Sequence, residues 1–251
     1  MIVPAGMTLK QMQDLSPKSA YYQQTIEMDT FRMQAVKEAA LQLGIQGGLA
    51  AESEQIDTVL DKNSGMLDTV FNFNWVLYHH NVLPPVIEES RDNGNLSGDS
   101  QSFRVGGQVY KIIHQVQFVT APPTWRDYLW MHYPPPKLPN HVLLPENDQE
   151  RDVWKAAVSR GWVEGQEQAI SIYEINLHRL TRDFTGMVLY KELLVQREVS
   201  PLYVTEQAQG VTGDGNQMTI DSRLMHIQAQ PQLQVYTQFW RPALMSGEMV
   251  P

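Results

Sequence analysis

Near the start of the chain, apolar residues recur every three or four positions, which is the spacing of one face of a helix. This pattern begins at Ser16-Pro17, where an N-cap residue precedes a proline, and runs to about Leu60. A second helical pattern covers Met66 to about His80. Pro84-Pro85 follows and ends it, because proline cannot extend a helix. The pattern therefore predicts a long helix and then a shorter one.

Another long helix is predicted in the second half of the chain. Asn147 and Glu150 have the spacing of a capping box, in which two side chains satisfy backbone N–H groups at the helix start. Apolar residues continue at helical spacing toward Pro201, which we expect to end the helix. Gly186 lies inside this stretch, and we expect it to bend or divide the helix.

After each helical stretch the pattern changes to that of β-hairpins. In the first half, a strand starts at Val86-Ile87, and Gly106-Gly107 has the composition of a two-residue hairpin turn between strands at 102–105 and 108–119. In the second half, strands are predicted at 203–206, 217–220 and 224–228, with turns at 212–215 and 221–222.

The two halves also resemble each other in sequence. When the chain is compared with itself at a constant offset, small residues, prolines and acidic residues coincide without a gap. Ala39, Ala40, Gly44, Gly48, Val82, Pro84 and Glu89 fall on Ala156, Ala157, Gly161, Gly165, Val199, Pro201 and Glu206. Two unrelated helix-plus-hairpin units would share some of these matches by coincidence. We interpret the pattern as an internal duplication, too short to be a solenoid.

Two pairs of glycines occupy equivalent places in the predicted long helices. Glycine inside a helix costs about 1 kcal/mol relative to alanine, so its repeated use indicates a compensating contact. Small residues four apart form a flat strip on which two helix backbones approach closely. We therefore predict that the long helices cross at Gly44, Gly48, Gly161 and Gly165.

The predicted fold is α+β, with two pseudo-repeats in a single compact domain that spans residues 1–251. Each repeat consists of a long helix or helices followed by a small antiparallel β-hairpin sheet. The predicted parts are a flexible arm (1–15), the first pseudo-repeat (16–121), an aromatic and proline connector (122–145), the second pseudo-repeat (146–230) and a C-terminal tail (231–251).

The charge balance argues against direct binding of nucleic acid. The chain carries 19 Lys and Arg against 28 Asp and Glu, a formal net charge of −9, and its basic residues form no cluster that could hold phosphate backbones. Cysteine is absent, which excludes disulfides, thiolate nucleophiles and cysteine-ligated metal sites. No stretch approaches the ~18 consecutive apolar residues of a membrane-spanning helix.

Residue patterns for catalysis are weak. Motifs for nucleotide binding, zinc-dependent proteolysis or a serine nucleophile are absent from the sequence. The histidines are scattered, and His79-His80 has no third ligand at a useful spacing, so we predict neither a metal site nor a cofactor. One hypothesis pairs Asp99 with Asp214 as an acid/base dyad. The simpler interpretation is that each carboxylate binds local backbone in a Gly-Asp turn, and we predict no catalytic residues.

The connector is the better functional lead. Trp125, Tyr128, Trp130 and Tyr133 lie close together beside prolines that favour a stiff, extended backbone. Tryptophan and tyrosine are enriched at the energetic centres of interfaces, so these four residues are a candidate partner surface. The alternative is that they pack the connector onto the helices, and exposure of Trp130 would favour the partner surface.

Several short segments, in order from about residue 30 to 230, closely resemble the DotC family of type IVB secretion systems, which includes the TraI lipoprotein of IncI-type conjugation systems. The most specific of them is Trp125-Arg126-Asp127-Tyr128-Leu129-Trp130. The others are 46–50 (Gln-Gly-Gly-Leu-Ala), 70–73 (Val-Phe-Asn-Phe), 81–86 (Asn-Val-Leu-Pro-Pro-Val), 109–113 (Val-Tyr-Lys-Ile-Ile), 150–152 with Trp154, and 210–213 (Gly-Val-Thr-Gly).

This resemblance implies a non-enzymatic lipoprotein of the outer membrane, in a periplasmic core complex with DotD-like and DotH-like subunits and in multiple copies. The sequence departs from the family in having neither a signal peptide nor a cysteine to carry the lipid. We expect that an N-terminal part is omitted and that residues 1–15 continue from the lipid anchor.

Two hypotheses of other classes stay open at this point. One is a periplasmic binding module that holds a ligand in a groove between the two halves, which a deep apolar pocket there would favour. The other is the hydrolase that uses Asp99 and Asp214. For the structural role, we expect partner strands to add to exposed edges of the hairpins.

Overall fold

The computed structural model describes residues 8–13, 30–78, 81–96, 103–214 and 216–240. It is an α+β fold, as the sequence predicts, with long helices and three separate two-stranded antiparallel sheets. The helices are α1 (Leu9–Gln13), α2 (Thr30–Lys62), α3 (Ser64–Val70), α4 (Trp125–Leu129) and α5 (Asp148–Gln196), with single 3₁₀ turns η1 (Phe73–Trp75), η2 (His141–Leu143) and η3 (Thr237–Phe239). The strands are β1 (Val82–Leu83), β2 (Val86–Leu96), β3 (Phe103–His114), β4 (Gln117–Phe118), β5 (Tyr203–Gly213) and β6 (Met218–Ala229).

The chain divides into two compact units, and each unit is made of two separate stretches of sequence. Unit 1 combines Met1–Asp68 with Arg126–His178, and unit 2 combines Thr69–Trp125 with Arg179–Pro251. These boundaries differ from those of the predicted pseudo-repeats, because α5 contributes its first part to unit 1 and its last turns to unit 2. The order of a long helix followed by a β-hairpin nevertheless occurs twice along the chain.

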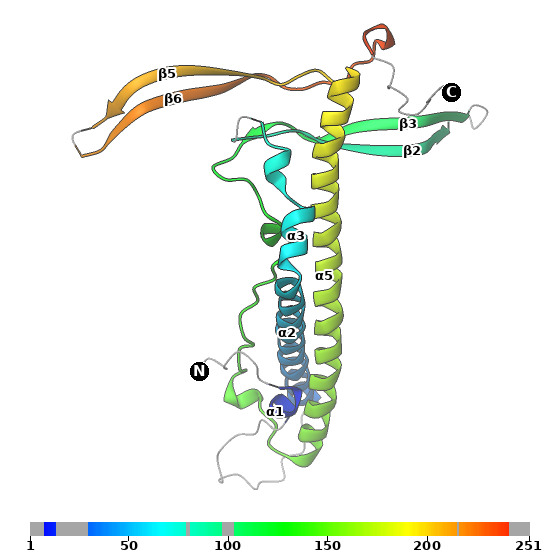
Figure 1. Cartoon of the computed structure of the whole chain (residues 1–251). Coiled ribbons are helices and arrows are strands. Elements are labelled where there is room, and N and C mark those ends of the chain that lie inside the picture. Colours follow the sequence, from blue (N-terminus) through cyan, green and yellow to red (C-terminus); the bar gives the residue numbers. More distant parts are fainter. Residues whose placement is uncertain (1–7, 14–29, 79–80, 97–102, 215, 241–251) are drawn as a thin grey trace. The chain divides into compact units, whose positions relative to one another are not determined.

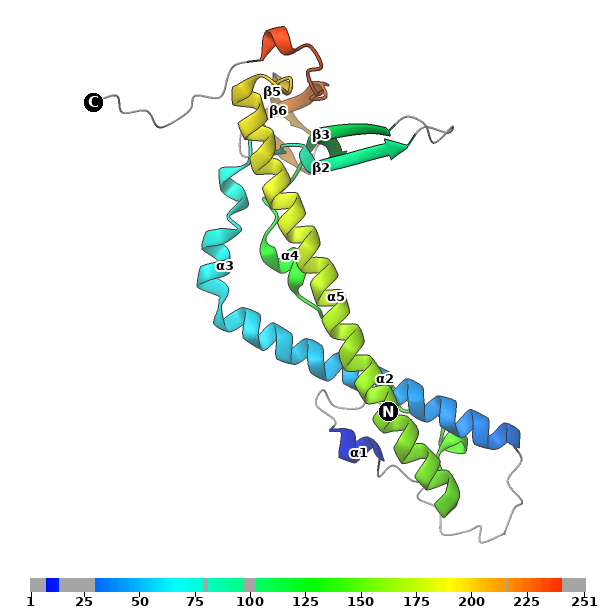
Figure 2. The same ribbon diagram turned by 90° about the vertical axis from the view of Figure 1, so that its right-hand side faces the viewer.

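Unit 1 is built around the crossing of α2 and α5, with α1 beside it (Figure 2). A Cβ added at Gly44 or Gly48 would overlap the backbone of α5 at Val158 or Trp162, and one added at Gly161 or Gly165 would overlap the backbone of α2 at Leu41 or Ile45. The helices therefore meet backbone to backbone at the four glycines of the predicted crossing. A core of buried residues lies next to this contact and consists of Met12, Val36, Ala40, Leu43, Trp154, Ala157 and Val158.

The predicted arm is not uniformly loose, since α1 forms within it. Met12 is 1% exposed and lies over Gly47, where any Cβ would displace its side chain. The indole Nε1–H of Trp154 donates to the carbonyl oxygen of Met12 over 3.0 Å in a buried position. This short helix was missed in the sequence because it has too few residues to show a period.

At the start of α5, only one of the two hydrogen bonds of the predicted capping box forms. Asn147 accepts a hydrogen bond from the N–H of Glu150 over 2.8 Å, as an N-cap residue does. The Glu150 carboxylate, however, accepts from the N–H of Glu146 and pairs with Arg32 of α2 over 2.8 Å. Glu150 is 1% exposed, so the residue that was predicted as a local cap also ties α2 to α5.

Two predicted helix ends are wrong, and one predicted division of a helix is absent. The helix predicted to reach His80 ends at Val70, where Phe71 and Phe73 turn onto the ring of Phe184 in edge-to-face contacts. Gly186 does not divide α5. The helix also ends before Pro201, at a Schellman motif in which the N–H groups of 197 and 198 donate to the carbonyls of 194 and 193. Arg197 there has φ +61°, a conformation that glycine usually supplies.

Both hairpins differ from the predicted strand limits. β3 passes straight through Gly106-Gly107 while paired with β2, so that dipeptide is not a turn, and the connection lies in 97–102, outside the described residues. β6 likewise continues through Asp221-Ser222. In unit 2 both hairpins lie near the C-terminal end of α5, and their strands extend away from it (Figure 1). The sequence does not show these strand limits, because a long ribbon that is exposed on both faces has no consistent alternation of apolar and polar residues.

Candidate interaction surfaces

The aromatic connector is divided between core and surface. Residues 125–129 form the helix α4 rather than an extended backbone, which corrects the prediction of a stiff connector at that point. Trp125 and Leu129, one helical turn apart, are 1% and 0% exposed, so Trp125 belongs to the core and not to a partner surface. Trp130 is 50% exposed, and Tyr128 and Tyr133 are half-buried. The candidate surface is therefore reduced to Trp130 with the two tyrosines.

Polar side chains of α2 hold the connector along that helix. The carboxylate of Asp57 accepts a hydrogen bond from the N–H of Met131 over 3.3 Å. The side chain of Gln46 accepts one from the N–H of Lys137 over 3.1 Å. Upstream, Arg126 of α4 pairs with Asp68 of α3 over 2.8 Å. The stretch 131–137 is thus fixed at both ends to α2.

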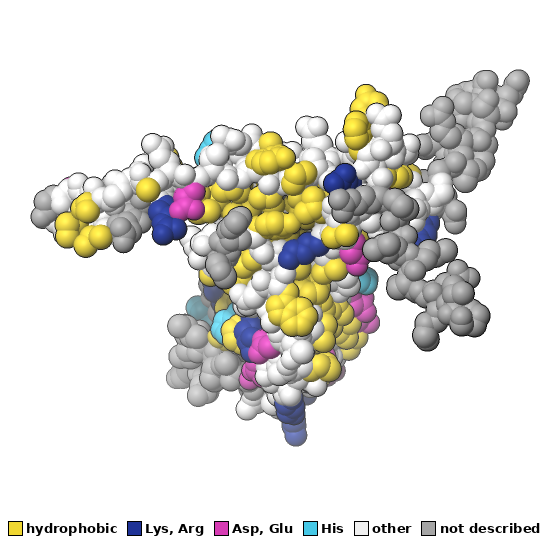
Figure 3. All heavy atoms as spheres, turned by 45° about the horizontal axis from the view of Figure 1, so that its top comes forward, with side chains coloured by type: hydrophobic (Ala, Val, Ile, Leu, Met, Phe, Trp, Pro, Cys, Tyr) yellow, Lys and Arg dark blue, Asp and Glu magenta, His cyan; other side chains and the backbone are white. Residues whose placement is uncertain are grey.

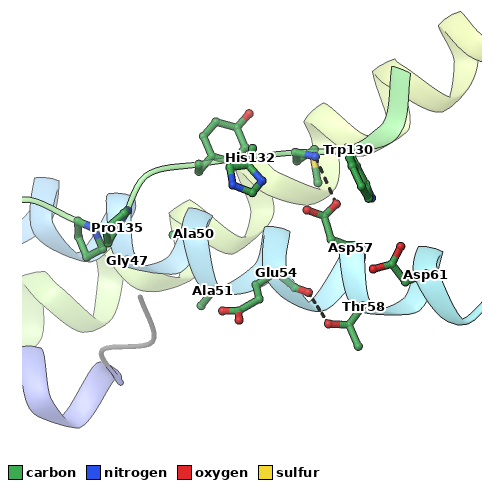
Figure 4. Close-up of a pocket in the computed structure, with 13 residues that line it drawn as sticks. Gly47, Ala50, Ala51, Glu54, Asp57, Thr58, Asp61, Trp130, His132 and Pro135 are labelled. Atoms are coloured by element: carbon green, nitrogen blue, oxygen red, sulfur yellow. Dashed lines mark hydrogen bonds between the residues drawn. The ribbon is translucent and has the colours of Figure 1, made fainter. Parts of the chain in front are cut away.

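A cavity of about 420 Å³ lies between α2 and this fixed stretch (Figure 4). On α2 it is lined by Gly47, Ala50, Ala51, Glu54, Asp57, Thr58 and Asp61, and on the connector by Trp130, Met131, His132, Tyr133, Pro135 and Pro136. Burial raises the pKa of Asp57, and nearby Asp61 adds to that rise, while the Met131 N–H and His132 oppose it. This cavity lies between the first pseudo-repeat and the connector, and not between the two pseudo-repeats.

The β5–β6 ribbon is a second candidate surface. Of its described side chains, none is buried. Several are large and apolar, and hydrophobic atoms are visible along this ribbon in the space-filling view (Figure 3). Val211, Met218, Ile220 and Leu224 are 62%, 66%, 64% and 53% exposed. Met218 and Ile220 lie two positions apart on β6, whereas the register with β5 shifts between Thr219 and Ser222, so the alternation does not extend to Leu224.

The β2–β3 hairpin is packed at its base. Val86 and Ile87 are 2% and 1% exposed, and they pack against α5 at Gly186, where a Cβ would lie 2.6 Å from a methyl carbon of Val86. Ile87 belongs to a core cluster with Tyr190, Leu193 and Val199. Gly186 is thus a contact position for a strand, which explains a glycine that the sequence alone made look like a break.

Of the two carboxylates in the hypothetical acid/base dyad, Asp99 and Asp214, the structure describes only Asp214. Asp214 lies in the β5–β6 turn and accepts hydrogen bonds from the N–H groups of Asn216 and Gln217, both over 2.9 Å. These backbone hydrogen bonds lower its pKa, so the carboxylate is held ionised in a turn, as the simpler interpretation predicts. Asp99 lies outside the described residues.

The described residues contain neither a metal-binding cluster nor a membrane-spanning helix. Within the described ranges, no three His, Cys, Asp or Glu side chains gather in a way that could hold a metal ion. No helix in the same ranges combines the length and apolar character that a bilayer crossing requires.

Residues 30–242 match the family described as type IV secretory system, conjugal DNA-protein transfer (TraI). The chain belongs to this TraI family. The match confirms the resemblance found in the sequence, and a search of curated proteins finds no match for the chain. A TraI-family chain is a component of a type IV secretion system, so its partners are other secretion subunits and it is associated with the cell envelope.

Residues of the segments that resemble the family make specific packing contacts and hydrogen bonds in this TraI-family chain. In the segment 46–50, Gln46 holds the connector, Gly47 receives Met12 and Gly48 contacts the α5 backbone. Phe73 and Trp125 fill core positions. Sequence reasoning missed the cavity, although the spacing of Glu54, Asp57 and Asp61 on one helix face, opposite an aromatic connector, was a signal that could have indicated it.

Proposed function

We propose that the chain is a structural subunit of the outer-membrane core complex of a type IVB secretion or conjugation system. It joins neighbouring subunits in the periplasm and makes or breaks no covalent bond. Family membership supports a role in a type IV secretion system. The observation that carries the finer proposal is the β5–β6 ribbon, whose described side chains are all at least partly exposed.

A ribbon of this kind is unfavourable in an isolated chain. An unsupported two-stranded hairpin is at best marginally stable in water, and its outer edges present unpaired N–H and C=O groups. A strand from a neighbouring subunit that adds to one edge would satisfy those groups. The exposed apolar side chains of Met218 and Ile220 would be covered at the same time, which lowers the free energy of the assembly by roughly 25 cal/mol for each Å² buried.

The partners we propose are DotD-like and DotH-like subunits and further copies of the chain in a ring. Attachment to the outer membrane through an N-terminal lipid is part of the same proposal, and a lipid anchor needs no membrane-spanning helix. The family resemblance supports both points. The net charge of −9 supports contact with protein subunits rather than with the transported nucleic acid.

The proposal is tested by purifying the protein from membranes of its host and identifying the co-purifying subunits. A Met218→Ser/Ile220→Ser variant removes two exposed apolar side chains from the ribbon. Truncating interface hot spots costs about 2 kcal/mol or more, so we expect co-purification and plasmid transfer to fall by about tenfold or more. The matched control, Val163→Ser/Val195→Ser, changes exposed apolar residues of α5 and is expected to behave as wild type.

Two results would contradict this account. Undiminished co-purification and transfer with the ribbon variant would remove the ribbon from the assembly. A structure of the complex in which partners contact helices alone would exclude strand addition while leaving the structural role in place.

A further inference from the structure

The cavity beside α2 is held open by the fold of unit 1. The two hydrogen bonds that fix the connector, from Met131 to Asp57 and from Lys137 to Gln46, are about 16 Å apart along the helix. Between them, α2 presents Gly47, Ala50 and Ala51, whose small side chains leave space under the connector. The volume of about 420 Å³ lies within the range of about 300–1,000 Å³ that is usual for ligand sites.

Apart from the imidazole of His132, the ionisable side chains that line the cavity, other than Tyr133, are carboxylates. Glu54, Asp57 and Asp61 are three and four positions apart, so they share one face of α2. The residues that line the cavity in the described chain include these three carboxylates and the imidazole of His132, and neither lysine nor arginine. Like charges at this spacing destabilise a helix by a few tenths of a kcal/mol per pair, and a bound cation would remove that cost.

An exposed aromatic ring stands next to the carboxylates. Trp130 is 50% exposed although its neighbours Leu129 and Met131 are buried, and Figure 4 shows it on the same side of α2 as Asp57 and Asp61. Carboxylates beside an indole face suit a guanidinium group, which pairs with carboxylates through its fork of N–H groups and stacks on aromatic rings. The apolar floor and the prolines require an aliphatic portion as well, which small inorganic cations lack.

We propose that this cavity receives an arginine side chain from an extended segment of a partner protein, with the guanidinium between Trp130 and the carboxylates of Asp57 and Asp61. The aliphatic stem of the arginine and an adjacent apolar residue lie over Ala50 and Ala51. The site belongs to unit 1 and uses no residue of the β5–β6 ribbon, so it stands or fails independently of the function proposed above.

The test titrates the full chain with the capped tripeptide acetyl-Leu-Arg-Leu-amide and with its citrulline counterpart, which has nearly the same shape but no charge. Binding is followed by the NMR signal of the Trp130 indole N–H, assigned by its loss in Trp130→Phe. We expect saturable shifts of this signal with the arginine peptide at millimolar concentrations or below, and binding at least ~10-fold weaker with the citrulline peptide. Raising the salt concentration should weaken the arginine complex, because part of its free energy is electrostatic.

Variants locate the interaction. Glu54→Gln/Asp61→Asn keeps the hydrogen bond of Asp57 and the shape of the cavity while removing two charges, and should weaken the arginine peptide ~10-fold. Glu38→Gln changes an exposed carboxylate of the same helix outside the cavity and should leave binding unchanged.

Three outcomes would overturn the proposal. One is the absence of any shift of Trp130 up to ~10 mM peptide. Another is equal binding of the arginine and citrulline peptides. A third is equal or tighter binding of spermine, which would make the cavity a site for small polyamines rather than for a protein segment.

Discussion

The α2–α5 crossing and the β5–β6 ribbon differ in how much of their surface the rest of the chain covers. At the crossing, two helices are so close that glycine is required on both sides, and the adjoining core is fully buried. In the ribbon, none of the described side chains of β5 and β6 is buried. The crossing is therefore stabilised from within the chain, whereas in the function we propose the ribbon is stabilised by contacts with partner subunits. Changes at the crossing should affect folding, and changes in the ribbon should affect association.

The largest effect is expected from bulk at the crossing. In Gly48→Leu/Gly165→Leu, each new side chain meets backbone of the other helix, including the amide nitrogen of Leu49 at 2.7 Å from a Cβ on residue 165. Because backbone cannot move aside as a side chain can, we expect a loss of about 3 kcal/mol or more of unfolding free energy, measured by denaturant titration. Gly65→Ala is the control, since a Cβ there meets nothing within 4 Å. Unchanged melting of the double variant would refute the crossing.

The next largest effect is the loss of unfolding free energy when a buried ion pair is broken, compared with the loss for an exposed pair. Arg32 pairs with Glu150, which is 1% exposed, whereas Arg223 pairs with Glu206 in the ribbon, where the two side chains are 65% and 45% exposed. Arg32→Ala leaves a buried carboxylate with fewer partners and should cost about 2 kcal/mol. Arg223→Ala should cost less than about 0.5 kcal/mol, because solvent screens its pair. Chemical denaturation of both variants measures the contrast, and equal losses would contradict it.

A double variant that also replaces Glu150 separates the charge of Arg32 from the packing of its side chain. In Arg32→Ala/Glu150→Gln the buried charge is absent, so part of the stability lost in Arg32→Ala should return. A double variant that is no more stable than Arg32→Ala would show that the arginine acts through packing of its side chain rather than through charge.

The stability of the protein should depend on pH through Tyr190, which is buried near the start of β5. Tyr190 belongs to the cluster from which β5 emerges, and burial, with a smaller contribution from Tyr78, raises its pKa to about 12. A raised pKa means that the folded state favours the protonated phenol. The associated stability is present below pH ~10 and is lost as the pH rises toward 12. Denaturant midpoints at increasing pH should fall less steeply in Tyr190→Phe, and an identical fall in both proteins would contradict this.

The smallest effect on folding is expected in the ribbon itself. Met218→Ser/Ile220→Ser should change the unfolding free energy by no more than about 0.5 kcal/mol, because both side chains are more than 60% exposed and leave no cavity. The same variant is the one expected to impair assembly. A large loss of stability would show that the ribbon packs on its own chain, and the comparison with the crossing would fail.

Sequence reasoning reached the parts of the molecule that repeat a local signal. Gly44, Gly48, Gly161 and Gly165 could be singled out because glycine is costly in a helix and its spacing is regular. The cap at Asn147 was recognisable from two residues. The misassigned turn at Gly106-Gly107 and the predicted break at Gly186 have one cause in common: glycine signals close approach or freedom of the backbone, and the pattern alone does not say which.

The candidate surfaces were less accessible to sequence. Of the four connector aromatics, the pattern offered no way to tell the buried Trp125 from the exposed Trp130, because Trp125 lies on the inward face of α4 and Trp130 follows the end of that helix. The cavity was not recognised in the sequence, because it exists only where the hydrogen bonds of Gln46 and Asp57 hold the connector against α2.

The sequence by itself determined the α+β class, the helix-then-hairpin order, the glycine positions and the family, because each depends on residues close together along the chain or on their order. The tertiary structure decided where Trp125 and Trp130 point, that Glu150 binds Arg32, that Gly186 receives a strand, and that one ribbon is packed at its base while the other is exposed. These depend on contacts between residues far apart in sequence, and such contacts are set by the competition for burial across the whole fold rather than by any local pattern.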